Sequence, residues 1–110
     1  MDVKQIASRL GLEEDDIYEV LEIFIRTAPS DLVKLNTAYS SRNTILIGET
    51  AHSLKGSTGT LGFTDVSEMA QQIMVQAGEK RIEDLSGSVP PFLDRMKDLL
   101  LELRKILDNR

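Results

Sequence analysis

The chain of 110 residues has the length of one domain, which we take to span residues 1–110. Its 13 Lys and Arg against 18 Asp and Glu give a net charge of −5 with the single histidine neutral, which disfavours nucleic acid as a partner. It has no cysteine, which excludes disulfides and thiolate chemistry, and no apolar run near the roughly 20 residues that cross a bilayer, so we expect a soluble, cytoplasmic protein without membrane contact.

Apolar residues recur at spacings of three and four along most of the chain, which is the period of amphipathic helices. The first predicted helix is short, covers residues 3–10 and is ended by Gly11. The first long helix follows over 13–29, and Ser30 caps a second long helix that ends near residues 40–43. The short connection at Pro29 makes these two helices antiparallel neighbours.

The second half of the chain continues the helical pattern. A third helix over 44–60 is closed by Gly62, and a fourth covers 64–78. Residues 79–89 are polar and are predicted to form a loop, after which the two prolines at 90 and 91 open a last, very apolar helix. The whole pattern predicts an all-α fold, an antiparallel four-helix bundle with a short additional N-terminal helix.

The helix over 44–60 carries the only histidine, His52. At about 100° per residue, one stripe of this helix collects five residues within about 40° and is the predicted core face: Ile47, Ala51, Leu54, Thr58 and Leu61. His52 lies about 140° from Ile47, so its imidazole points to solvent or to a partner rather than into the core.

Three glycines, Gly48, Gly56 and Gly59, share the outward face with His52. Each costs a helix about 1 kcal/mol relative to alanine, and three cost about 3 kcal/mol against a typical domain stability of about 5 to 15 kcal/mol. Clearance around the imidazole gives a physical reason for accepting this loss of stability, because a bulky group or another protein can then approach the ring. The alternative for Gly48 and Gly59 is close approach of a neighbouring helix.

Lys55 lies about 60° round the helix from His52 and brings a cation beside the imidazole. A cation and a cleared nucleophilic ring suit a phosphoryl group, whose oxygens accept hydrogen bonds from an ammonium. The simpler interpretation makes His52 an exposed surface residue and Lys55 a solvated charge.

The run Ala51-His52-Ser53-Leu54-Lys55-Gly56, followed by Leu61-Gly62, resembles the signature of histidine-containing phosphotransfer (HPt) domains. That signature is H-x-L-K-G with L-G five residues after the glycine, and all its defined positions match. The resemblance implies a helical bundle of similar size, with the histidine on an outward-facing helix.

The resemblance further implies that His52 accepts a phosphoryl group from the aspartyl phosphate of a receiver domain and passes it to another receiver in a multistep phosphorelay. Lys55 would hold the phosphoryl oxygens, and Gly56 would leave room beside the ring. The implied partners are response-regulator receiver domains and a hybrid sensor histidine kinase, with the chain itself a monomer. The expected partner-binding residues are on the same helix: Ile45, Gly48, Glu49 and Gly59.

No glycine-rich nucleotide loop is present, so we expect a phosphoryl carrier without ATP-dependent kinase activity. We also expect no cofactor and no metal site, because Glu49 is the only acid close to His52 on its helix and the Mg²⁺ needed for transfer would belong to the receiver. An enzyme with His52 as general base is disfavoured, since a convex helix face offers no pocket. A helical adaptor that binds a receiver or kinase without being phosphorylated stays open as an alternative.

Overall fold

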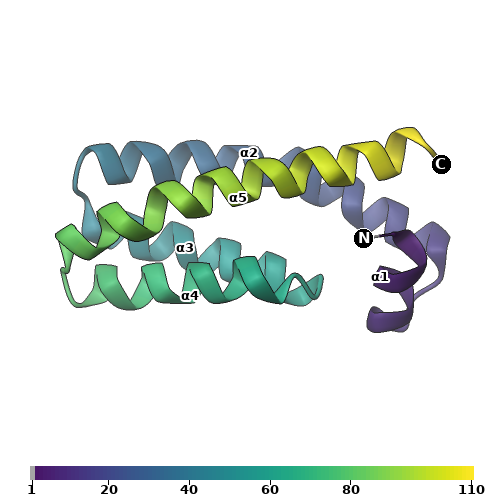
Figure 1. Ribbon diagram of the computed structural model, residues 1–110, viewed down its shortest axis with the longest axis horizontal. Coiled ribbons are helices and arrows are strands. Elements are labelled where there is room, and N and C mark those ends of the chain that lie inside the picture. The colour runs from purple at the N-terminus through teal and green to yellow at the C-terminus, as the bar shows by residue number, and fades with distance from the viewer. Residues whose placement is uncertain (1) are drawn as a thin grey trace.

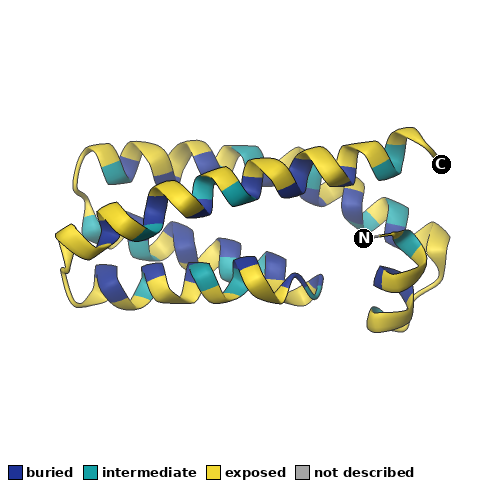
Figure 2. Ribbon diagram, in the orientation of Figure 1, coloured by how far each residue is buried: buried dark blue, intermediate teal, exposed yellow. Residues whose placement is uncertain are grey.

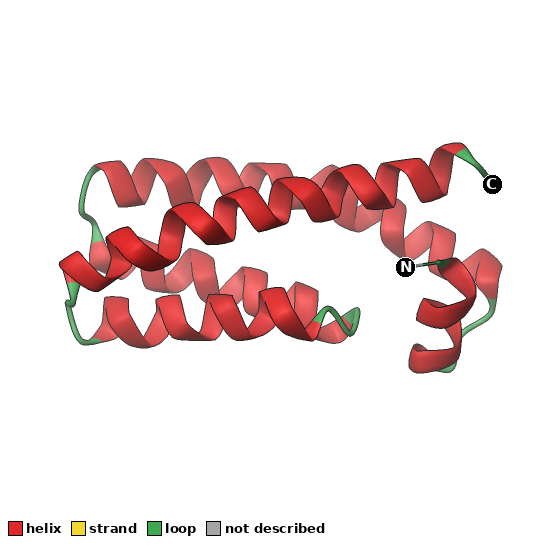
Figure 3. Ribbon diagram, in the orientation of Figure 1, coloured by secondary structure: helices red, strands yellow, loops and turns green. Residues whose placement is uncertain are grey.

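The computed structural model describes residues 2–110, and the regular structure in that range is entirely helical (Figures 1 and 3). It consists of five helices: α1 (Val3–Leu10), α2 (Glu14–Ser40), α3 (Thr44–Thr60), α4 (Thr64–Gly78) and α5 (Ile82–Asp108). The predicted all-α fold is therefore confirmed.

The four long helices form a closed ring of antiparallel neighbours (Figure 1). Helix α2 packs against α3 and α5, and α4 packs against the same two helices from the other side. Helices α2 and α5 each have 27 residues, which is about 40 Å of helix and accounts for the 42 Å length of the molecule. The shorter α3 and α4 lie along one part of this length, and α1 packs on α2 near the other end (Figure 1).

Each long helix turns one apolar stripe towards a common core (Figure 2). The core is mostly aliphatic and includes side chains from every helix, with Ile6 from α1 and Leu21, Leu54, Ile73 and Leu103 from the others. Burying one such side chain stabilises a fold by about 1.5 to 3 kcal/mol. The shared core explains why the helices pack side by side.

The prediction that α2 would break at Pro29 was wrong, and so was the cap at Ser30. Helix α2 runs through Pro29, which joins two predicted helices into one and leaves four long helices in all. An interior proline costs about 3 kcal/mol. The apolar stripe continues without interruption across it, with Phe24 and Ala28 buried before the proline and Leu32 after it, and this burial offsets the cost.

Of the predicted loop over 79–89, residues 79–81 do connect two helices, but the prediction was wrong from residue 82 onwards, because α5 already begins at Ile82. Leu85 and Val89 lie in the core, so residues 82–89 form an amphipathic helical segment whose polar residues face the solvent. Two prolines, at 90 and 91, fall inside α5 instead of opening it. Both are exposed, as are residues 86 and 87, whose carbonyls lose their helical donors and can bond to water there.

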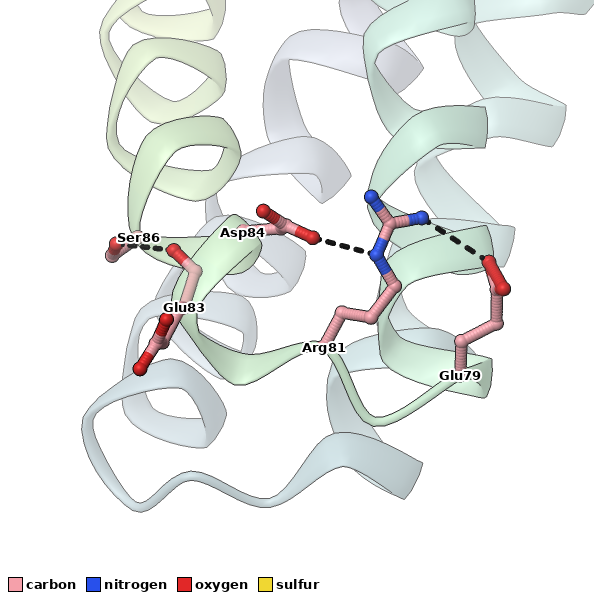
Figure 4. A network of polar contacts seen from close by, with 5 residues as sticks. All are labelled: Glu79, Arg81, Glu83, Asp84 and Ser86. Atoms are coloured by element: carbon pink, nitrogen blue, oxygen red, sulfur yellow. Dashed lines mark hydrogen bonds and ion pairs between the residues drawn. The ribbon is translucent and has the colours of Figure 1, made fainter.

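The turn between α4 and α5 is held by one arginine (Figure 4). Arg81 donates from Nε to Asp84 Oδ2 over 2.6 Å and from Nη1 to Glu79 Oε1 over 3.3 Å. The hydrogen bond to Asp84, the charge of Asp84 and the hydrogen bond to Glu79 raise the pKa of Arg81 above its ordinary value. Asp84 lies in the first turn of α5, so this contact supports the helix start that the sequence pattern missed.

Gly11 and Gly62 both end helices in the left-handed region, with φ of 69° and 80°, as their positions predicted. Gly62 also lies under α1, because a Cβ built on it would be 2.8 Å from the Nε of Arg9. Among residues 2–110, no helix combines the length and the apolar character that spanning a membrane requires.

Replacing Gly62 with alanine tests this close approach. We expect Gly62→Ala to lower the free energy of unfolding by about 1 to 2 kcal/mol, because its φ is unfavourable for an L side chain and Arg9 has to move. Gly87→Ala is the matched control. Its Cβ meets nothing within 4 Å in a helix, so it should raise the free energy of unfolding by up to about 1 kcal/mol. Urea unfolding measures the free energy of unfolding of both variants. Equal changes in the two variants would contradict the close approach of Arg9 to Gly62.

Candidate functional site

Helix α3 buries one narrow stripe and leaves the opposite side open. All five residues of the predicted core face are buried: Ile47, Ala51, Leu54, Thr58 and Leu61. His52 is exposed and lies in the middle of α3. The helical wheel therefore placed the imidazole correctly, on the solvent-exposed side of α3.

Local hydrogen bonds explain why this glycine-rich sequence stays helical. Asn43 caps α3 by accepting a hydrogen bond at its Oδ1 from the Leu46 amide over 3.1 Å. The buried hydroxyls of Thr50 and Thr58 donate to Leu46 and Leu54 carbonyls of the same helix, over 2.8 and 2.7 Å. These buried hydroxyl groups thus find their hydrogen-bond acceptors inside α3 and need none from the neighbouring helices.

The charged groups beside His52 are unequal in exposure. Lys55, one turn after His52, is half-buried, whereas Glu49, one turn before it, is exposed. Neither makes an ion pair with another of residues 2–110. On the α2 side, Ser53 donates to Asp31 Oδ2 over 3.4 Å, a long and exposed contact. Lys55 thus places a cation that makes no ion pair within residues 2–110 one turn from the imidazole.

The three glycines of α3 have different surroundings. A Cβ on Gly56 would meet nothing within 4 Å, and one on Gly48 would make an ordinary contact with the Ala77 Cβ at 3.7 Å. A Cβ on Gly59 would lie 3.1 Å from the Oγ of Ser67 on α4. Gly56 thus fits the clearance interpretation, whereas Gly59 fits the alternative that a neighbouring helix approaches closely.

Two shallow apolar depressions lie on either side of His52. One is formed by Ile45 and Gly48 of α3 with Met74 and Ala77 of α4. The other is formed on the α2 side by Ile23 and Thr27 with Gly56 and Thr60. Ile45 is 73% exposed and Ile23 is 52% exposed.

Sequence reasoning found Ile45 but missed two residues of this region, Ile23 and Ser67. Ile23 lies at an exposed position of α2, and such a position does not reveal which helix will lie beside it. Ser67 is an ordinary small polar residue in its local sequence. The only available signal was Gly59, whose missing side chain indicates a close neighbour without naming it.

No group of three or more His, Cys, Asp or Glu side chains among residues 2–110 could hold a metal ion. The surroundings of His52 instead combine an exposed nucleophilic ring, a neighbouring cation, open space at Gly56 and apolar flanks. This arrangement can accept a compact anionic group delivered by another macromolecule, because the ring projects from a convex face rather than from a pocket.

Comparison with known proteins agrees with this geometry. The family model of the Hpt domain matches residues 19–109, which include α3, α4, α5 and most of α2. The chain belongs to the Hpt domain family. Hpt domains are phosphocarriers rather than kinases and interact with receiver domains and kinases, so the chain is involved in histidine phosphotransfer in two-component signalling. No curated protein and no solved structure matches the chain.

Alanine at two of the glycines separates open space from helix contact. Gly56→Ala should raise the free energy of unfolding by up to about 1 kcal/mol, since it favours the helix and meets no atom. Gly59→Ala should lower it by about 1 kcal/mol, because the methyl group crowds Ser67. Thermal and urea unfolding of the two variants check this, and a stabilised Gly59→Ala chain would refute the close contact.

Proposed function

We propose that this chain is a phosphorelay carrier in which His52 accepts a phosphoryl group from an aspartyl phosphate of one receiver domain and donates it to another. The observation that carries the proposal is the exposed imidazole of His52 on α3, with Lys55 one turn away and open space at Gly56. The donor in this scheme is the receiver of a hybrid sensor histidine kinase. The imidazole and the cation come from one helix of one chain, so a monomer suffices.

In the proposed transfer, one bond from phosphorus to oxygen breaks and one bond from phosphorus to nitrogen forms. The lone pair of an imidazole nitrogen of His52 attacks the phosphorus, the bond from phosphorus to the aspartate oxygen breaks, and the carboxylate leaves on the receiver. The Lys55 ammonium stabilises the charge on the phosphoryl oxygens during transfer. The same steps in reverse hand the group to a second receiver. Both the N–P bond and the acyl phosphate are activated, so the direction follows the relative populations.

Gly56 has a separate part in this proposal. A Cβ there would project into open space on the side from which the receiver approaches. Its absence lets the backbone around the aspartyl phosphate come close to the imidazole. Since transfer needs the reacting atoms about 3 to 3.5 Å apart, the clearance at Gly56 contributes to the rate even though it costs the helix some stability.

The docking surface in this proposal extends along both sides of His52. The exposed face of α3 from Ile45 to Thr60 spans about 22 Å, and a standard interface of about 800 Å² per partner is about 28 Å across. A receiver centred on His52 therefore covers the depression at Ile45 and the one at Ile23. Their apolar side chains supply the contact area, with Glu49 and Gly48 between Ile45 and the ring.

Transfer of labelled phosphate to His52 tests the function directly. A panel of phosphorylated receiver domains, and ATP alone, are each incubated with the wild-type chain and with His52→Gln. We expect acid-labile label on the wild type from at least one receiver, none on the variant, and none from ATP. Label from ATP alone would reveal a kinase activity, and receiver binding without any label would favour the unphosphorylated adaptor.

Two glutamate substitutions test the docking surface. Ile45→Glu places a charge in the expected apolar contact and should weaken receiver binding about tenfold, equal to about 1.4 kcal/mol. Val33→Glu is the matched control, because Val33 is 66% exposed on α2 and lines neither depression. Titration calorimetry with the labelling receiver measures both affinities. Equal affinities for Ile45→Glu and the wild type would remove Ile45 from the interface.

A further inference from the structure

Ser67 joins α4 to the backbone of α3 within one turn of His52. Its Oγ donates a hydrogen bond to the carbonyl oxygen of Lys55 over 3.2 Å, across twelve residues of sequence and in a partly buried place. The same oxygen lies 3.1 Å from where a Cβ on Gly59 would be. Because Gly59 has no side chain, the Ser67 hydroxyl can lie close to the backbone of α3 at this point.

This contact acts on the main chain of α3 and not on a mobile side chain. The Lys55 carbonyl is already the helical acceptor for the Gly59 amide and also accepts a long contact of 3.4 Å from the Thr58 hydroxyl of α3. Ser67 adds the donor that comes from the neighbouring helix. Because Lys55 follows His52 by three residues, fixing its carbonyl against α4 fixes the rotation of α3 at the turn that carries the imidazole. The contact does not fix the Lys55 ammonium, because it involves only the backbone of this residue.

The buried core stripe sets which side of α3 faces inwards, and few polar contacts with other helices fix its position more finely. The buried hydroxyls of Thr50 and Thr58 bond inside α3, and its core stripe contains the small residue Ala51. Among residues 2–110, two side-chain hydrogen bonds tie α3 to other helices. One is Ser67 to Lys55, and the other is the longer, exposed contact of Ser53 with Asp31. The Ser67 contact is the shorter and more buried of the two.

We propose that Ser67 is a positioning residue for phosphoryl transfer, which holds the backbone of α3 against α4 so that the imidazole of His52 meets the incoming phosphoryl group from one fixed position. This inference rests on the proposed function. Displacing a reacting group by about 1 Å can slow a transfer by about 100-fold. Ser67 is only partly exposed and packs beside Gly59, so it acts through α3 without touching the phosphoryl group.

The test separates position from stability with one double variant. Single-turnover transfer from the receiver that labels the wild type is measured for Ser67→Ala, Gly59→Ala and the double variant, together with urea unfolding. Ser67→Ala should lower the rate constant at saturating receiver about tenfold and leave the half-saturating receiver concentration unchanged. The control is Ser86→Ala, whose hydroxyl bonds only within α5, and it should transfer at the wild-type rate.

The double variant gives the decisive comparison. Removing the Ser67 oxygen makes room for the methyl group of Gly59→Ala, so the double variant should be more stable than Gly59→Ala alone. Its transfer rate should nevertheless remain as low as that of Ser67→Ala, because the hydrogen bond to Lys55 is still missing. A purely structural role would restore rate and stability together.

Two results would overturn the inference. One is a Ser67→Ala rate within about twofold of the wild type, which is below the effect of even a small displacement. The other is recovery of the rate in the double variant. A labelled wild type with either result refutes the role of Ser67 alone, whereas a wild type that takes no label from any receiver refutes the proposed function and this inference with it.

Discussion

Burial of one narrow stripe on α3 is the constraint from which the rest of the site follows. The stripe combines the large side chains of Ile47, Leu54 and Leu61 with the smaller Ala51 and Thr58, and α3 packs on both α2 and α4. Since a helix repeats every 3.6 residues, the burial of this side forces the opposite side into solvent. His52, Gly56 and Ile45 are on that opposite side, and their exposure is a consequence of core packing.

The same constraint brings the neighbouring helices close to the reactive turn. A helix with larger core residues would be held further from its neighbours. Here Ser67 of α4 and Asp31 of α2 both reach α3 within one turn of His52. The imidazole thus projects from a helix that is hydrogen-bonded to both of its neighbours. Group transfer favours such preorganisation of the reacting groups.

Local periodicity was enough to predict the helical fold, the core face of α3 and the exposure of His52, because each depends on spacing within one segment. It failed at Pro29 and over residues 82–89, where burial of side chains against distant helices outweighed local preference. Gly62 was predicted correctly because a left-handed helix end is also a local property.

The remaining parts of the site depend on pairing between helices, which spacing within a single helix does not encode. The contact of Gly59 with Ser67 requires the register of α3 against α4, and the place of Ile23 requires that of α2 against α3. Gly48 and Gly59 look equivalent on a helical wheel, yet only Gly59 has a tight neighbour. Three-dimensional packing was needed to tell them apart.

Helices α2 and α5 extend beyond the α3–α4 hairpin, and both chain ends lie at that extended end of the bundle (Figure 1). A fluorophore, an affinity handle or a solid support joined to either end would be placed away from the centre of α3. Dyes joined there would report on α1 and on the tips of α2 and α5. The face around His52 would remain uncovered for encounter with a partner.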